Sequence, residues 1–261
     1  MGCGWLGLPL AKHLIENGYH VNGSTTSSSK IEVLESVGVS PFIIQLTSEG
    51  VIGPIASCLA QCKTLILNIP PGLRADPNSH YIRKIEHLIT HIESSEVKQV
   101  LFIGSTSVFP DDSTIPIITE TSPTARSKNA EQLFAVEALF QKNKNFKTTI
   151  LRFGGLFAED RHPAKFLSGK TDLKNPDAPV NLIHRTDCIG IIVSILEYRA
   201  WNTVFNASTT PHPTRKNYYT TVCKALQIPI PHFALNQINE GKIINSEKLV
   251  RLLNYKFKVK L

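Results

Sequence analysis

Three glycines stand at the start of the chain with the spacing of a phosphate-binding loop. They form the pattern G-x-G-x-x-G over Gly2, Cys3, Gly4, Trp5, Leu6 and Gly7. In such a loop the first glycine allows a tight turn, the second lets the backbone approach a pyrophosphate, and the third lets helix and strand pack closely. The helix expected directly after the loop offers free N–H groups and the positive end of its dipole to phosphates. The pattern predicts a dinucleotide site; the alternative interpretation is a structural turn without a ligand.

The stretch 23–30 indicates which dinucleotide fits. An acidic residue at the end of the second strand usually binds the ribose hydroxyls of NAD. Here the sequence is Gly-Ser-Thr-Thr-Ser-Ser-Ser-Lys, and no carboxylate occurs before Glu32. Hydroxyl groups and a lysine suit a 2′-phosphate, so we expect NADP, with NAD as the alternative. The residues assigned to the cofactor besides the glycine loop are Ser24, Thr25, Thr26, Lys30, Pro70 and Pro71. A serine-rich turn that caps the next helix is the competing interpretation.

Strands and helices alternate around these motifs. The sequence predicts helices at 8–17, 29–37, 52–61, 81–93 and 128–142, and strands at 19–25, 42–46, 64–69, 100–104 and 148–153. This order predicts an α/β fold with a Rossmann-type, doubly wound parallel sheet. We expect residues 1–153 to form the dinucleotide-binding domain, with 181–206 completing its sheet. Residues 154–180 and 207–261 would form a small α+β lobe facing the substrate, with a last half-buried strand at 256–260.

The glycine loop stands unusually early in the chain. Such a loop normally follows the central strand of the sheet, but only Met1 precedes Gly2. A sheet without its centre would leave apolar strand edges unpaired. The first strand is therefore missing from the pattern, and we expect about five to ten further residues upstream of Met1, the length of one strand.

Several segments resemble the extended short-chain dehydrogenases/reductases, which include sugar-nucleotide epimerases and dehydratases. These segments are 100–109 (VLFIGSTSVF), 151–157 (LRFGGLF) and 181–187 (NLIHRTD), while 161–163 and 212–215 are similar to an atypical branch of NAD-dependent epimerase/dehydratase-like proteins. The resemblance implies that Ser105 matches the catalytic serine, with Thr106 beside it. Phe109 stands where the family has a tyrosine.

The chain departs from the family at its Tyr-x-x-x-Lys motif. In one register Lys128 occupies the lysine position, where it would hold the nicotinamide ribose, but Thr124 stands in place of the tyrosine. A threonine hydroxyl has too high a pKa and too short a reach to replace the phenol as the acid/base. A second register places Glu137, rather than Glu131, in a helix position that the family often fills. That register leaves neither tyrosine nor lysine.

Other side chains could supply a substitute acid or bind the substrate. Tyr81, His162 and His184 are candidates, because histidine titrates near neutral pH and Tyr81 follows the proline loop. The alternatives are an aromatic core residue for Tyr81 and a structural histidine for His184. Arg161 and Arg215 would bind an anionic substrate together with both histidines, or else form surface ion pairs.

The composition excludes several classes of protein. The chain has 261 residues with a net charge of +7, and its basic residues are scattered, so we expect no nucleic-acid partner. No apolar stretch is long enough to cross a membrane and no signal peptide is evident, so we expect a cytoplasmic protein. The five cysteines fit a reducing compartment. Cys58 and Cys62 lie one helical turn apart, which we interpret as two small residues on one face, and we expect no metal site.

Two functions follow from these observations. The first is an NADP-dependent oxidoreductase or epimerase acting on a small polar or anionic substrate. The second is a non-catalytic NADP(H)-binding redox sensor that has lost the catalytic tyrosine. A scaffold without a ligand is a third interpretation, and a homodimer is one possible assembly.

Overall fold

The computed structural model describes residues 1–73, 79–234 and 238–261. Its centre is a parallel sheet with the order β11-β8-β6-β5, formed by β5 (Thr64–Leu67), β6 (Gln99–Ser105), β8 (Lys147–Phe153) and β11 (Val204–Ala207). The strands β6 and β8 pair from Gln99 opposite Lys147 to Ser105 opposite Phe153. Helices cover both faces of this sheet, which explains why consecutive residues are buried in β6 (100–102) and in β8 (148–153), rather than only alternate ones.

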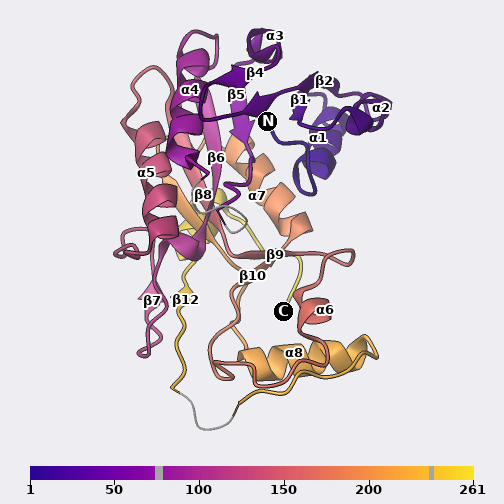
Figure 1. Cartoon of the computed structure of the whole chain (residues 1–261), viewed down its shortest axis with the longest axis vertical. Helices are drawn as coiled ribbons and strands as arrows, with labels where there is room; N and C mark the ends of the chain where they lie inside the picture. The colour runs from indigo at the N-terminus through magenta and orange to yellow at the C-terminus, as the bar shows by residue number, and fades with distance from the viewer. Residues whose placement is uncertain (74–78, 235–237) are drawn as a thin grey trace.

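A second parallel pair continues the sheet on the N-terminal side. It consists of β1 (Asn22–Thr25) and β2 (Ser40–Ile43). Residues 1–3 lie between this pair and β5, where Figure 1 shows the N-terminus. The Met1 amine donates to the Ile66 carbonyl (2.5 Å), and the Cys3 N–H donates to the Ser24 carbonyl (2.8 Å). The glycine loop therefore emerges at the middle of the sheet, as the sequence predicted.

Two helical layers sandwich the sheet, which confirms the doubly wound architecture. The layers are α1 (Gly7–Glu16), α7 (Arg185–Glu197) and α9 (Glu247–Leu253) on one face, and α3 (Ile55–Leu59), α4 (Tyr81–Glu93) and α5 (Lys128–Lys142) on the other. Leu10, Ile191 and Leu249 form the first core, and Leu59, Ile85 and Val136 form the second. The short η1 (Ser28–Lys30) and α2 (Ile31–Ser36) follow β1, and β3 (Gln45–Leu46) pairs with β4 (Val51–Ile52).

A smaller lobe lies at the carboxyl end of the sheet. Its elements are β9 (Gly155–Phe157), α6 (Pro163–Leu167), β10 (Leu182–His184) and α8 (Arg215–Ala225), with η2 (Thr106–Val108) and the pair β7 (Ile117–Ile118) and β12 (Ile243–Ile244) beside it. Its core contains Phe157, Ala164, Tyr218 and Cys223. Figure 1 shows α6 and α8 together, well separated from α3 and α4.

The C-terminal region differs from the expectations in two respects. Leu249 and Leu253 of α9 pack on the main sheet together with Leu101 and Leu151, so this part of 207–261 belongs to the sandwich rather than to the lobe. The segment 256–260 is no strand: the Asp187 carboxylate accepts the N–H groups of Lys258 (2.7 Å) and Val259 (3.1 Å), which takes the donors that a strand partner would need. Within the described ranges, no helix has the length and apolarity to cross a bilayer.

Candidate functional site

The glycine loop has the geometry of a ligand cradle. A Cβ on Gly2, which has a φ of +88°, would lie 2.2 Å from the Asn68 carbonyl oxygen, and a Cβ on Gly7 would lie 2.1 Å from the Gly2 oxygen. These two glycines permit close approach of backbone to backbone. A Cβ on Gly4 would meet nothing within 4 Å, so the middle glycine borders open space. The three positions thus carry the roles that the sequence pattern assigns to them.

Two backbone N–H groups of this loop have no backbone partner among the described residues. The Gly4 N–H donates to the Gly2 carbonyl (2.8 Å), whereas the N–H groups of Trp5 and Leu6 have no backbone acceptor among the described residues. They directly precede the ten-residue helix α1. Free N–H groups and a helix dipole together favour an anion.

The residues assigned to a 2′-phosphate divide into two groups. The Ser24 hydroxyl accepts the Gly2 N–H (3.1 Å) and the Thr25 hydroxyl accepts the Ser27 N–H (3.2 Å), so both hold the loops in place. Thr26 and Lys30 are exposed. Lys30 lines a hollow of about 660 Å³ between α1 and α2, together with Gly4 and Lys12. Pro70 and Pro71 lie in the loop that follows β5, next to Asn68 and the glycine loop.

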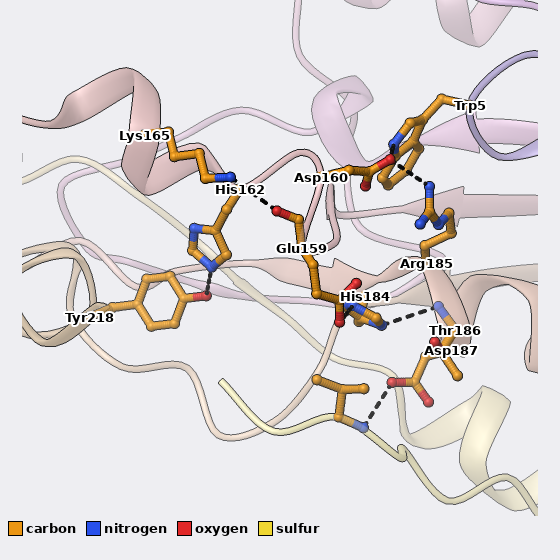
Figure 2. Close-up of polar contacts among 11 residues, drawn as sticks. Trp5, Glu159, Asp160, His162, Lys165, His184, Arg185, Thr186, Asp187 and Tyr218 are labelled. Atoms are coloured by element: carbon orange, nitrogen blue, oxygen red, sulfur yellow. Dashed lines mark hydrogen bonds and ion pairs between the residues drawn. The ribbon is translucent and has the colours of Figure 1, made fainter. Parts of the chain in front are cut away.

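The Trp5 ring of the glycine loop contacts two guanidinium groups. The Arg161 carbon Cζ is 5.1 Å and that of Arg185 is 4.7 Å from its ring centroid. Asp160 connects the group, because its carboxylate accepts the Trp5 Nε1–H (3.1 Å) and an Arg185 N–H (3.0 Å), as Figure 2 shows. Burial opposes ionisation of Asp160, but the bonds from Arg185 and Trp5 keep the pKa of its carboxyl below the usual range. We name this set the tryptophan clamp.

The sequence identified Trp5 and Arg161 but missed Asp160 and Arg185. Both are direct neighbours of predicted site residues, Arg161 and His184, and that adjacency was the available signal. It was insufficient because only the fold brings 158–161 over the glycine loop, more than 150 residues away in the chain.

Ser105 ends β6 and keeps its own proton available. Its oxygen accepts from the Ser107 N–H (3.2 Å) and from the Ser107 hydroxyl (2.8 Å). With both bonds accepted, its O–H remains able to donate to a ligand. Thr106 is buried, as the first residue of η2.

Buried charges behind Ser105 bear on the two registers. Glu137 on α5 is buried and forms an ion pair with Arg152 on β8 (2.6 Å). Glu131 is exposed, and Lys128 is the exposed first residue of α5, after the N-cap Ser127. Of the two acidic residues, only Glu137 is therefore part of the core, and the register of the family motif stays a prediction.

Both site histidines cap helices. The His184 Nδ1 accepts the Thr186 N–H (3.2 Å), and its Nε2 lies 3.2 Å from a Glu159 carboxylate oxygen. The His162 Nδ1 accepts the Ala164 N–H (3.1 Å), and its Nε2 lies 3.2 Å from the Tyr218 hydroxyl. Since each Nδ1 accepts, each neutral ring carries its proton on Nε2. Burial lowers the pKa of His162, and Lys165 and His184 act in the same direction.

The remaining candidates have structural partners. Tyr81 is buried (3% exposed), and burial raises the pKa of its phenol far above the usual range, which removes it as an acid near neutral pH. Arg215 donates to the Lys174 carbonyl (2.7 Å) and packs over Phe233. In the described part of the chain, no group of three or more His, Cys, Asp and Glu side chains has a metal-binding arrangement.

Comparison with known proteins places this geometry in context. No family model matches the chain. It is 27% identical over 263 residues to the protein YeeZ of Escherichia coli K12, with 98% of this chain and 94% of that protein covered. A UDP-glucuronic acid 4-epimerase from Bacillus cereus in complex with NAD superposes with a TM-score of 0.81 at 16% identity, over 99% of this chain and 90% of the other.

A short-chain dehydrogenase/reductase superfamily protein from Agrobacterium tumefaciens, with bound NAD, superposes with a TM-score of 0.75 at 13% identity, over 99% of this chain and 91% of that one. Likenesses that span nearly both chains concern the whole fold rather than the sheet alone. The chain therefore has the fold of the short-chain dehydrogenases/reductases, in the form seen in NAD-dependent epimerases.

Proposed function

We propose that the protein binds NADP(H) and uses it in an oxidoreductase or epimerase reaction on a small anionic substrate. The observation that carries this proposal is the cradle at residues 2–7, where Gly4 borders open space and two free N–H groups precede α1. Structural relatives that bind NAD at a related fold support a dinucleotide as the ligand.

The residues present fit such a cofactor. The loop N–H groups would hold the pyrophosphate, and Lys30 with Lys12 would face the adenosine end across the adjacent hollow. A lysine in a stretch (23–30) that contains no acidic residue favours a 2′-phosphate over a bare ribose, which supports NADP over NAD. When bound, the nicotinamide would supply or accept a hydride.

The chain's own residues would orient the substrate. The Ser105 O–H can donate to a substrate carbonyl or hydroxyl at the end of β6. Arg161, in the lobe above the glycine loop, supplies positive charge for an anionic group. The Nε2 of His184, which lies 3.2 Å from a carboxylate oxygen of the exposed Glu159, is the group that we assign as the proton donor in place of the absent tyrosine.

A redox-sensing regulator is the second candidate. The departure from the Tyr-x-x-x-Lys motif favours it, because Thr124 stands where the family has its catalytic tyrosine. Such a protein would bind NADP(H) without turning it over.

Titration with NADPH and NADH, followed by nicotinamide fluorescence, tests the cofactor. Lys30→Ala should weaken NADPH binding at least about tenfold and change NADH binding less than threefold, because only NADPH carries the 2′-phosphate. Lys144→Ala removes the same charge from an exposed position on another loop and serves as the control. Binding of neither nucleotide by the unmodified protein would refute the proposal.

NADPH consumption with a panel of carbonyl substrates then separates the two candidates. Turnover that Ser105→Ala reduces at least about 100-fold, with NADPH affinity unchanged, supports the enzyme. Ser36→Ala, at an exposed serine of α2, is the control. Tight NADPH binding without turnover of any substrate supports the sensor.

A further inference from the structure

We propose that Arg185 is a phosphate ligand of the dinucleotide, and that Asp160 occupies this arginine in the free protein until the phosphate replaces it. The proposal rests on the proposed function, because it concerns the same nucleotide site. It adds to that site a ligand and a competitor that lie far from the glycine pattern in the chain. Both residues line the hollow between α1 and α2, together with Gly4 and Lys30.

The position of Arg185 on α7 places its side chain at the glycine loop. Arg185 is the first residue of that helix, after the N-cap His184, whose Nδ1 accepts the Thr186 N–H (3.2 Å). From there the guanidinium carbon lies 4.7 Å from the centroid of the Trp5 ring. The backbone N–H of Trp5 is one of the two loop donors without a backbone acceptor among the described residues. A phosphate bound to these donors would therefore lie within reach of the arginine.

The Arg185 guanidinium has more donors than its present partner uses. Arginine carries five N–H donors in a planar fork that fits two phosphate oxygens. One N–H donates to Asp160 (3.0 Å), and the described residues supply no other acceptor for this side chain. Arg185 can therefore bind a phosphate through two parallel hydrogen bonds, which are stronger than a single bond to a carboxylate oxygen.

Asp160 lies in a tight turn that two backbone hydrogen bonds between Ala158 and Arg161 close (3.1 and 3.0 Å). One oxygen of its carboxylate, Oδ2, accepts both the Arg185 N–H and the Trp5 Nε1–H, as Figure 2 shows. The Asp160 side chain is 55% exposed and that of Arg185 is 24% exposed. Ion pairs with this exposure contribute little to stability, so the fold loses little when another anion replaces the carboxylate.

The charges in the hollow explain why the two anions compete. Its described lining residues include three basic ones, Lys12, Lys30 and Arg185, and one acidic one, Asp160. A carboxylate and a phosphate beside one guanidinium repel each other, because like charges a few ångströms apart interact unfavourably even in water. Asp160 therefore opposes nucleotide binding, both by its own charge and by its bond to Arg185.

Titration with NADPH and NADH tests both residues. Arg185→Gln should weaken binding of both nucleotides at least about tenfold, because the pyrophosphate is common to them. Lys30→Ala is expected to act mainly on NADPH, so the two variants have different signatures. Asp160→Asn keeps an oxygen for the Trp5 Nε1–H but removes the charge, so it should strengthen binding of both nucleotides at least about threefold.

Matched controls make the same chemical changes elsewhere on the surface. Arg199→Gln lies at the other end of α7, and Asp172→Asn lies in the lobe; both positions are exposed. Neither should change the Kd of either nucleotide by more than about 1.5-fold. In the double variant, most of the gain from Asp160→Asn should disappear, because that gain depends on releasing Arg185. A gain as large as in the unmodified protein would overturn the competition.

The outcomes separate this proposal from the proposed function. Unchanged affinities of Arg185→Gln and Asp160→Asn for both nucleotides would overturn the proposal and leave the function intact. If the unmodified protein binds neither nucleotide, the function fails, and calorimetry with inorganic pyrophosphate tests the exchange by itself. Pyrophosphate binding that Arg185→Gln weakens and Asp160→Asn strengthens would support the exchange, and absence of pyrophosphate binding would overturn it too.

Discussion

Removing the carboxylate of Glu137 should destabilise the protein more than any other change of one charge on α5. The side chains of Glu137 and Arg152 are 1% and 3% exposed. The guanidinium donates to the carboxylate at 3.0, 3.0 and 2.6 Å. In Glu137→Ala this guanidinium stays buried without its counter-charge, which costs about 3–5 kcal/mol for a buried pair.

The other contacts of Arg152 place the expected cost near the lower end of that range. It keeps a hydrogen bond to the Glu120 carbonyl (3.3 Å) and its position over the Phe109 ring (5.0 Å). At roughly 2–4 °C per kcal/mol for a chain of this size, the unfolding midpoint should fall by about 6–12 °C. Calorimetry measures this directly.

Glu131→Ala is the matched control, because it makes the same chemical change at an exposed position of the same helix. It should change stability by less than about 0.5 kcal/mol. A midpoint for Glu137→Ala within about 2 °C of that for Glu131→Ala would refute the reasoning. The double variant Glu137→Leu, Arg152→Met should be more stable than either single variant, because no buried charge remains.

Removal of Arg152, the other partner of this ion pair, should make the stability of the protein depend on pH. Burial raises the pKa of Glu137, although Arg152 opposes the shift. Arg152→Met removes that opposition and raises the pKa further. The folded state then binds a proton that the unfolded state releases, so stability should fall as pH rises from the unfolded value toward the folded one. Unfolding measured at pH 5 and pH 8 should show the variant closer to the unmodified protein at pH 5.

Four further substitutions test nucleotide binding, stability or both. Gly4→Ala should weaken NADPH binding at least about tenfold without shifting the unfolding midpoint, since its Cβ enters open space. Gly7→Ala should weaken NADPH binding and also lower the unfolding midpoint, because its Cβ would meet the Gly2 oxygen. His162→Asn should lose less stability between pH 7 and pH 5 than the unmodified protein does. Burial lowers the pKa of His162, so protonation below about pH 6.5 favours the unfolded state. An equal loss of stability in both proteins over this pH range would contradict this. Asp187→Ala should cost about 3 kcal/mol and expose the tail near Lys258 to limited proteolysis, since two backbone N–H groups lose their acceptor.

The sequence predicted those parts of the fold that local chemistry determines. The helix expected at 128–142 coincides with α5, because the N-cap Ser127 and the apolar spacing mark its start and its buried face. The glycine loop was equally readable, since Gly2 and Gly7 meet steric requirements within the chain and Gly4 borders open space.

The hydrogen-bond and ion-pair partners of individual residues were less predictable, because these partners lie far apart in the chain. The segment 256–260 alternates polar and apolar side chains, as a strand would, but the buried carboxylate of Asp187 accepts its N–H groups instead. In the site, helix spacing could not tell which of Glu131 and Glu137 is buried. That depends on the position of Arg152 on β8.

The tryptophan clamp has a practical consequence. The chain contains two tryptophans, and one of them, Trp5, lies inside the loop proposed to bind phosphate. Its ring contacts two cations, and its Nε1–H donates a hydrogen bond to a carboxylate. Indole fluorescence depends on the charges around the ring. An anion that binds Arg161 or Arg185 and moves it from the ring should therefore change the wavelength and intensity of the Trp5 emission. In a Trp201→Phe background the protein would be its own optical probe, reporting contact between the lobe and the glycine loop without a label.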